Sequence, residues 1–220
     1  MKKKNFSHLL KGYTLLFIFL ASCLQGWAQS SLVKYPDWTA EELEKANTAK
    51  NTNLTDEEKL VYLYCNLARL DGQRFAKTYA QPFLQQNSTF VSSLRTELSK
   101  TRNLPLLYPD PILSKTALSH ATDLGEKGLM GHDSSNGDSF ATRIRRAYKG
   151  NKIAENCAYS SENDALSFVM QLLVDDGVQS LGHRKNILNK DYNAMGVSVH
   201  RHTKYGFTLV QDFGDIISNQ

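Results

Sequence analysis

The amino-acid sequence predicts a single domain of the α+β class, in which helices and strands share one core. Two segments, near residues 55–70 and 110–125, carry a helix cap followed by apolar residues at helical spacing. Near the C-terminus, apolar and polar residues alternate over two stretches joined by a short turn, a pattern typical of a β-hairpin. The length left after an N-terminal leader suits one domain with a sizeable core.

The leader, residues 1–28, has the three parts of a secretory signal peptide. A start with four lysines precedes the nearly all-apolar stretch 13–24, and small residues flank Trp27 at the cleavage positions. The apolar stretch is shorter than the roughly 18 to 20 residues that a membrane span needs, and polar residues follow it, so we favour cleavage over a transmembrane helix.

An alternative processing of the leader depends on Cys23. The run Leu20-Ala21-Ser22-Cys23 resembles a bacterial lipoprotein signal, in which acylation of Cys23 would tether the protein to a membrane. Because apolar Leu24 follows and Ala28 offers a second acceptable site, we favour simple cleavage. The protein is therefore expected to be secreted, or to lie in the periplasm or cell envelope, and to associate with a membrane only if Cys23 is acylated.

The net charge argues against a nucleic-acid partner. The whole chain carries 26 Lys and Arg against 22 Asp and Glu. The leader holds four of the lysines and none of the acidic residues, so the mature chain is formally neutral. A neutral chain without a dense basic patch offers no electrostatic attraction to nucleic acid or to an anionic membrane surface.

The remaining elements follow in order from caps and periodicity. Residues 29–54 are expected to form an N-terminal helical extension, which begins with a capping box at Thr39 and Glu42 and ends in a polar joint at 47–53. Residues 55–217 form the main domain, which opens with a second capping box at Thr55. Its other helices are expected at 91–98, 110–125, 138–148 and 163–173, and its strands at 153–159, 195–199 and 207–211.

Two loops of the domain each carry a histidine. The segment 128–137 is rich in Gly, Ser, Asp and Asn and contains His132, and the segment 180–184 contains His183. Loops held by a rigid frame are where binding and catalysis concentrate, so His132 is a candidate functional residue.

Two cysteines, Cys65 and Cys157, remain after cleavage of the leader. Thiols outside the cytoplasm oxidise readily, so we predict that these two form a disulfide, worth about 4 to 5 kcal/mol on the chain-entropy model. The alternative is two buried free thiols, since cysteine is also an ordinary small core residue.

Five short motifs, read in order, resemble those of the CAP superfamily. That superfamily comprises the cysteine-rich secretory proteins, antigen 5 and the plant pathogenesis-related class one proteins, together with a bacterial single-domain branch. The motifs are Asn66-Leu67-Ala68-Arg69, Gly131-His132-Asp133, Ala154-Glu155-Asn156, the run 182–188 (GHRKNIL) and Met195-Gly196-Val197. The resemblance implies a three-layer α-β-α sandwich with a central, mostly antiparallel sheet.

The resemblance also implies a cleft lined by two histidines and two acidic residues. His132 and His183 match the histidines, and Glu155 matches the first acid. The second acid has no clear counterpart, because the helix before His183 lacks the family's Trp and Glu. Asp175 or Asp176 could reach the cleft instead, and we assign Asp176 to it.

The cleft residues allow more than one chemistry. Family members hold metal between their two histidines, so His132 and His183 are expected to bind zinc or another divalent cation. In the alternative, Glu155 and Asn156 only tie down the two histidine loops by hydrogen bonds. Arg69 and Arg184 are expected to be structural and to bind carboxylates or helix-end carbonyls.

The resulting prediction is a non-enzymatic extracellular binding domain whose cleft contains His132, Glu155 and His183, with a lipid or a surface component as the expected kind of ligand. One alternative is a metal-assisted hydrolase acting on peptide or cell-wall material, in which Ser134 or Ser135 could act beside His132. It lacks the strained glycine elbow of serine hydrolases and the His-Glu-x-x-His helix. Another is a lipid-anchored surface protein.

Overall fold

A four-stranded sheet runs through the centre of the computed structural model, which describes residues 37–216. The strand order is β1-β3-β4-β2, with β1 at Tyr108–Pro109, β2 at Ile153–Ser160, β3 at Ala194–His202 and β4 at Gly206–Gly214. Only β1 pairs in parallel, with β3, and the other pairings are antiparallel. The predicted mixed fold with a mostly antiparallel sheet is confirmed. The leader with Cys23, and residues 29–36 and 217, lie outside the described part.

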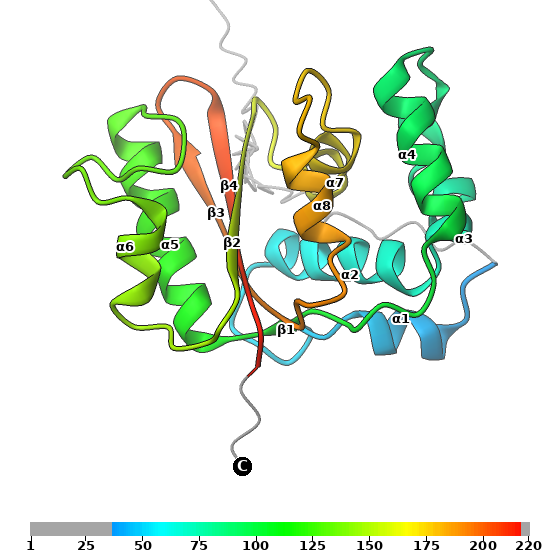
Figure 1. The fold of residues 1–220 in the computed structure, drawn as a ribbon, viewed down its shortest axis with the longest axis horizontal. Helices are drawn as coiled ribbons and strands as arrows, with labels where there is room; N and C mark the ends of the chain where they lie inside the picture. The colour runs from blue at the N-terminus through cyan, green and yellow to red at the C-terminus, as the bar shows by residue number, and fades with distance from the viewer. Residues whose placement is uncertain (1–36, 217–220) are drawn as a thin grey trace, which may run out of the picture. The chain divides into compact units, whose positions relative to one another are not determined.

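The helices are α1 (Ala40–Ala46), α2 (Asp56–Leu70), α3 (Gly72–Lys77), the 3-10 helix η1 (Gln81–Gln85), α4 (Thr89–Lys100), α5 (Pro111–Lys127), α6 (Phe140–Arg145), α7 (Ala165–Val174) and α8 (Gly182–Ile187). In Figure 1, α5 and α6 lie on one side of the sheet, and α2, α7 and α8 lie on the other. This arrangement gives the predicted three layers.

Helix starts follow the predicted caps. Thr39 and Thr55 each accept a bond from the backbone N–H three residues on, and the Glu at that position bonds back to the cap backbone. Asp110 caps α5 and Ser139 caps α6 with their side-chain oxygens alone, which satisfies N–H groups that a helix leaves unpaired at its start. Caps therefore fix these helices locally.

Helix ends were predicted less well. The expected end of α5 at Gly125 is wrong, because the helix continues to Lys127 and ends at Gly128 in the left-handed conformation, φ 63°. Gly125 is a packing residue instead: a Cβ there would lie 2.1 Å from the carbonyl oxygen of Arg201 on β3. This glycine lets α5 lie close against the sheet.

One segment predicted to be a loop is a helix. The segment expected to be irregular at 180–184 begins α8, whose N-cap residue makes no side-chain capping bond of its own. Its N-cap, Leu181, adopts φ 53°, a conformation that a leucine rarely takes and that sequence patterns do not reveal. The tertiary contacts of the helix, described below, hold it in place.

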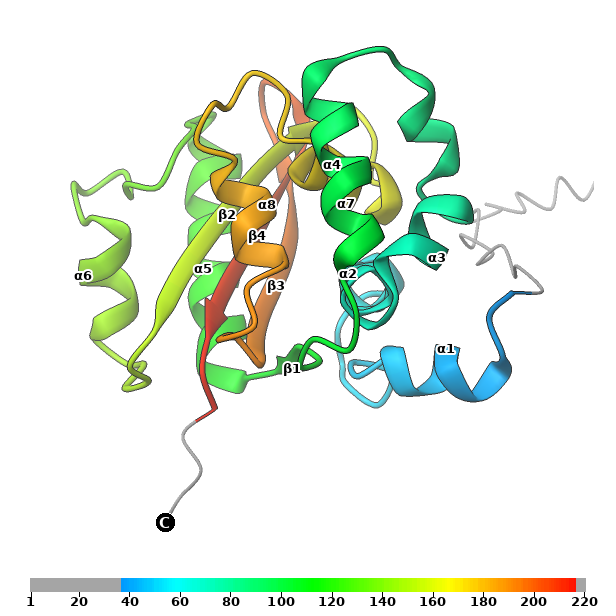
Figure 2. The same ribbon diagram turned by 45° about the vertical axis from the view of Figure 1, so that its right-hand side comes forward.

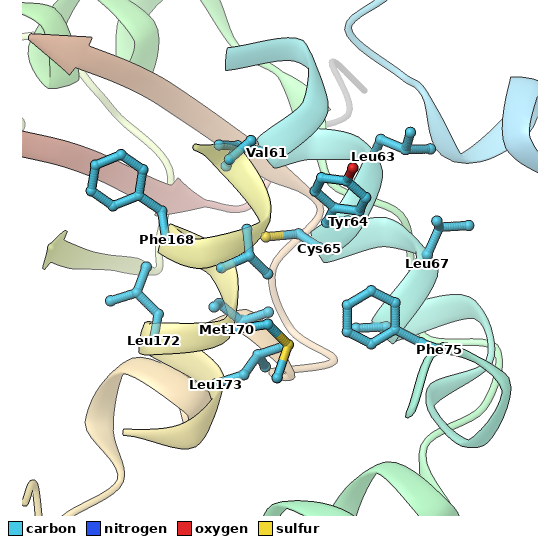
Figure 3. Packing of buried hydrophobic residues seen from close by; sticks show 14 of the residues in the cluster. Val61, Leu63, Tyr64, Cys65, Leu67, Phe75, Phe168, Met170, Leu172 and Leu173 are labelled. Carbon is cyan, nitrogen blue, oxygen red and sulfur yellow. The ribbon is translucent and has the colours of Figure 1, made fainter. Parts of the chain in front are cut away.

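Apolar residues form separate clusters on the two faces of the sheet. The larger one joins α2, α7 and the sheet, and Figure 3 shows Val61, Cys65, Phe168 and Met170 within it. A smaller one between α5 and the sheet contains Ala117, Ala121, Leu124 and Val210 and receives Cys157 and Tyr159. Burying both faces of the sheet fixes its position between the helix layers.

The N-terminal extension packs on the same domain. Trp38 is buried and its indole Nε1 donates to Thr78 Oγ1 at 3.0 Å. The side-chain amide of Asn66 donates to the carbonyl oxygen of Ala46 at 2.9 Å, within the first of the five motifs. Within residues 37–216, no helix combines the length and the apolar character that crossing a bilayer requires.

The structure corrects the predicted disulfide: Cys65 and Cys157 are both free thiols. Cys65 belongs to the α2 cluster, where Gln211 Nε2 lies 3.5 Å from its sulfur. Cys157 points to the opposite face and packs with the α5 cluster. The sheet separates the two sulfurs, so a bond between them would require the backbone to move. Spacing along the chain could not show on which face each cysteine lies.

Candidate functional site

The first candidate histidine, His132, pairs with Glu155 on β2. Its Nδ1 lies 2.8 Å from Glu155 Oε1, and the carboxylate, in a residue only 6% exposed, also binds Arg143 of α6 through Oε2. Arg143 further donates to the carbonyl oxygen of His132 at 3.0 Å. One buried carboxylate and one arginine therefore fix the ring and the backbone of the histidine together.

The pKa values of the two acidic groups at this pair, Glu155 and Asp212, are shifted in opposite directions. Burial acts to raise the pKa of Glu155, but the hydrogen bond from His132 and the charge of Arg143 outweigh it, so the pKa is lowered. The neighbouring Asp212 of β4 has a pKa well above its ordinary value, because it is buried and faces the Glu155 charge. Glu155 therefore favours its anionic form, and Asp212 holds its proton more strongly than an ordinary aspartate. The hydrogen bond to Glu155 raises the pKa of His132.

The second candidate histidine, His183, pairs with Asp175. Its Nδ1 lies 2.7 Å from Asp175 Oδ1, while Oδ2 accepts the backbone N–H of His183 at 2.9 Å and that of Arg184 at 3.2 Å. Asp175 is 2% exposed. Its carboxylate therefore serves both the imidazole and the start of α8, which has no cap of its own.

The structure places Asp175, and not the predicted Asp176, beside the histidine. Asp176 is exposed and lines a nearby cavity. The helix α7 ends at Val174, and Asp175 turns into the left-handed conformation, φ 56°. That turn redirects the chain, so helical periodicity no longer indicates which of the two aspartates points inward.

The edge strand β2 separates the two histidine pairs. Successive side chains of a strand point to opposite faces. Glu155 thus meets His132 on the α5 side, whereas Asn156 donates to the carbonyl oxygen of His183 at 3.1 Å on the α8 side. Figures 1 and 2 both show β2 between α6 and α8. Glu155 and Asn156 hold the two histidine segments, as the hydrogen-bonding alternative of the sequence analysis expects.

Both imidazoles direct Nδ1 at a carboxylate, and within residues 37–216 neither Nε2 has a hydrogen-bond partner. Histidines that bind a metal commonly donate their other ring N–H to a carboxylate, which fixes the tautomer and orients the ring. By donor chemistry, His132 and His183 therefore fit a divalent cation held through Nε2.

A different set of ligand-type side chains lies closest together. Of the described residues, His120, Glu155 and Cys157 have ligand atoms within 4.8 Å of one another, and His132, Glu155 and His183 do not form such a group. His120 Nε2 lies 3.1 Å from the carbonyl oxygen of Gly131, and burial lowers the His120 pKa. Because the Arg143 guanidinium already neutralises Glu155, this buried group fits a cation poorly.

A cavity of about 420 Å³ lies beside His183. Cys157 and Ala158 of β2, Met170 and Val174 of α7, and Phe83 of η1 are among its lining residues. The sulfur of Cys157 also lies 3.8 Å from His132 Nδ1. The sulfur of Cys157 therefore lies next to the ring of His132, and the same residue also lines the cavity that His183 borders.

The loop that carries His132 is anchored by Asp123 of α5. Its carboxylate accepts Ser135 N–H at 2.7 Å and Ser135 Oγ at 2.6 Å, and Lys127 Nζ lies 2.8 Å away. Partial burial acts to raise the pKa of Asp123, but these donors outweigh it and lower the pKa from 3.8 to about 2.

A depressed carboxyl pKa stabilises the folded state above the unfolded pKa, and that stabilisation is lost as the pH falls toward the folded value. We therefore expect Asp123→Asn to lower the free energy of unfolding most from about pH 5 upward. The difference in free energy of unfolding between variant and wild type should shrink between about pH 4 and pH 2. Urea unfolding of both proteins across this range measures it. A difference that stays constant over the range would contradict the role given to Asp123.

The two motif arginines are structural, as predicted. Arg69 and Arg184 are fully buried. Arg184 donates to the carbonyl oxygens of Leu173 and Val174 at the end of α7. Arg69 donates to four carbonyls, those of Pro105, Ile187, Asn189 and Tyr192, at 2.6 to 2.9 Å. These bonds hold the ends of α7 and α8, and thereby the position of His183.

The fold and the motif order agree with the resemblance to the CAP superfamily. Residues 64–213 match the model of the cysteine-rich secretory protein family, CAP. This match covers more than half of the 220 residues, and the chain belongs to that family. The resemblance stated from the motifs is confirmed.

Several solved structures are similar to this chain. An extracellular protein with an SCP domain from Bacillus anthracis has 20% identity and a TM-score of 0.47, and the match covers 81% of this chain and 44% of that one. This chain therefore spans less than half the length of the Bacillus protein. An outer surface protein of Borrelia burgdorferi has 24% identity and a TM-score of 0.43, with 64% and 94% covered. Schistosoma mansoni venom allergen-like protein 4 has 12% identity and a TM-score of 0.46, with 74% and 90% covered. None of the curated proteins matches this chain.

Proposed function

We propose that this protein is a secreted, non-enzymatic binding domain that takes an extracellular ligand at the open edge of β2, between His132 and His183. The observation that carries the proposal is the shared arrangement of the two histidines. Each imidazole is held by a buried carboxylate through Nδ1 and keeps Nε2 for another partner. Two buried carboxylates thus orient two partly exposed rings. This arrangement favours a binding role for the rings over a purely structural one.

The partner proposed for the two Nε2 atoms is a divalent cation, with zinc as the first candidate. Neutral imidazole nitrogens are good zinc ligands, and a site with only two protein ligands leaves positions for a bound molecule. A bound zinc ion would supply a Lewis-acidic centre for an oxygen of the ligand. The residues contribute orientation: Glu155 and Asp175 fix the rings, and Asn156 ties the backbone of His183 to the strand.

The serines of the His132 loop favour binding over hydrolysis. A serine nucleophile needs its hydroxyl hydrogen-bonded to a base. Ser134 Oγ accepts instead from Arg143 at 3.3 Å, and Ser135 Oγ donates to Asp123 at 2.6 Å. Both hydroxyls thus support the loop, and neither is paired with an imidazole in the described part of the chain.

Secretion is part of the proposal and is supported by the leader pattern of residues 1–28. Mass spectrometry of the protein from its natural host tests it. Cleavage after Ala28 gives an unmodified mature N-terminus, whereas a lipid on Cys23 would replace secretion by membrane anchoring.

The metal part is tested by calorimetric titration of the purified domain with zinc. We expect a single equivalent to bind to the wild type, and the His132→Ala, His183→Ala double variant to bind at least about 100-fold more weakly, since loss of outer-shell partners alone costs about 10- to 100-fold. His200→Ala is the matched control, because His200 lies on β3 and its Nδ1 contacts only a neighbouring backbone carbonyl. Equal affinity of the double variant and the wild type would refute the site.

A further inference from the structure

The strand β2 lies at the open edge of the sheet. In the order β1-β3-β4-β2 it pairs on one side only, with β4, over the whole of residues 153–160. An edge strand presents unpaired N–H and C=O groups that can pair with another extended chain. Which of these groups are available follows from the register of the ladder.

The hydrogen bonds of β3 fix this register. The carbonyl of Met195 accepts the N–H of Asp110, and Val199 N–H donates to the Glu58 side chain, each at 3.0 Å. The odd-numbered residues of β3 therefore direct their backbone groups away from β4. In an antiparallel ladder, hydrogen-bonded and non-bonded pairs alternate along each strand.

The alternation continues across β4 to β2. Val199 lies opposite Leu209, and Leu209 lies opposite Ala158. Since Val199 and Leu209 form a non-bonded pair, Leu209 directs its backbone groups at Ala158. The even-numbered residues of β2 thus pair with β4, and the backbone groups of Glu155, Cys157 and Tyr159 face the open edge.

Of these three residues, only Glu155 has its edge-facing carbonyl occupied. Its oxygen accepts Asn186 Nδ2 of α8 at 3.3 Å. The N–H and C=O of Cys157 and Tyr159 have no hydrogen-bond partner within residues 37–216. Both residues are half-buried, at the point where the cavity beside His183 reaches β2 through Cys157 and Ala158.

We propose that the ligand of this domain is an extended peptide segment, which adds as a strand to the edge of β2 at Cys157 and Tyr159. This inference rests on the proposed function, because it names the partner of the same site. The two residues are spaced i and i+2, so their N–H and C=O groups repeat at the interval of an extended backbone, about 6.6 Å. An extended backbone offers complementary donors and acceptors at that interval, and main-chain pairing of this kind is a known mode of peptide recognition.

The surroundings of the edge suggest which side chains the peptide carries. Alternate side chains of an added strand would point to opposite faces. One set would face the cavity, where Met170, Val174 and Phe83 offer contacts to an apolar side chain next to polar lining residues such as Gln171, Asp176 and His183. The other set would face the exposed ring of His132, which tolerates polar groups. The expected pattern is therefore an apolar residue at every second position.

The test uses short linear random peptides displayed on phage, selected against the mature protein and then synthesised. Amide hydrogen exchange followed by NMR should show the N–H groups of Cys157 and Tyr159 slowed at least about tenfold by a selected peptide. Methylation of the peptide backbone at alternate nitrogens should lower the affinity about tenfold or more at one set of positions and little at the other. The absence of any enriched peptide, or protection of amides away from β2, would overturn the inference.

Two substitutions at the edge provide a matched pair. Tyr159→Pro removes the edge-facing donor without removing a ladder bond to β4, and Tyr159→Ala removes the side chain but keeps the donor. The proline variant should bind the peptide about tenfold more weakly than the alanine variant, and equal affinities would count against strand addition. If the proline variant does not fold, the methylated peptides on wild-type protein decide. Zinc titration of the same samples is a separate measurement. If the protein binds zinc but no peptide, only the peptide inference is refuted.

Discussion

Replacing Arg69 with methionine is expected to destabilise the fold by about 3 to 5 kcal/mol, the largest effect that we predict for one side chain. Arg69 is fully buried and donates to the carbonyls of Pro105, Ile187, Asn189 and Tyr192. Burial lowers its pKa to about 10, so the guanidinium stays charged at neutral pH. Methionine fills similar space but leaves four carbonyls without their donors, each of which costs about 1 to 3 kcal/mol before relaxation.

Urea unfolding measures this loss, and Arg146→Met is the matched control. The Arg146 side chain is 61% exposed and pairs with Asp138 at the surface, so its replacement should change stability by less than about 1 kcal/mol. If the two variants were equally stable, Arg69 would not be the residue that joins α2 to the chain segment leading into β3.

Replacing Asp175 with alanine is expected to affect both stability and zinc affinity. Its carboxylate accepts three bonds, from the ring of His183 and from the backbone N–H groups of His183 and Arg184. Loss of these charge-assisted bonds in a buried position should cost about 2 to 4 kcal/mol. Without Asp175 the ring of His183 is no longer oriented, and the affinity for zinc should fall about 10- to 100-fold.

The neighbouring Asp176→Ala is the control for both measurements. Asp176 is exposed, so its removal should leave the urea midpoint and the zinc affinity close to those of the wild type. A larger effect from Asp176 than from Asp175 would mean that the aspartate first assigned to the cleft from the sequence is the functional one.

Local chemistry explains which parts of the fold were predictable. The capped helices α1, α2, α5 and α7 carry their start signals in a few adjacent residues, and the β3–β4 hairpin carries its alternation in residues 195–199 and 207–211. The helix α8 has no such signal. It begins at Leu181 in a strained conformation and depends on Asp175 and on the buried Arg184, which are tertiary contacts.

The same distinction applies to the site. His132, Glu155 and His183 lie in motifs that could be recognised along the chain, whereas Arg143, Asp175 and Asp212, which contact them, lie in no motif. In the sequence, nothing distinguishes Arg143 from any surface arginine of a short helix, or Asp212 from any other strand residue. Only the folded chain places both next to Glu155. The wrong disulfide has the same origin, because the face of the sheet on which Cys157 lies is set by strand register.

The central claim is that His132 and His183 act together on one cation at the edge of β2. X-ray absorption spectroscopy of the protein loaded with a single equivalent of zinc tests it most directly. The account predicts two imidazole nitrogens in the zinc shell, completed by oxygen ligands, with no sulfur. A sulfur ligand would place the metal instead at His120, Glu155 and Cys157 and would contradict the account, as would a shell with fewer than two imidazoles.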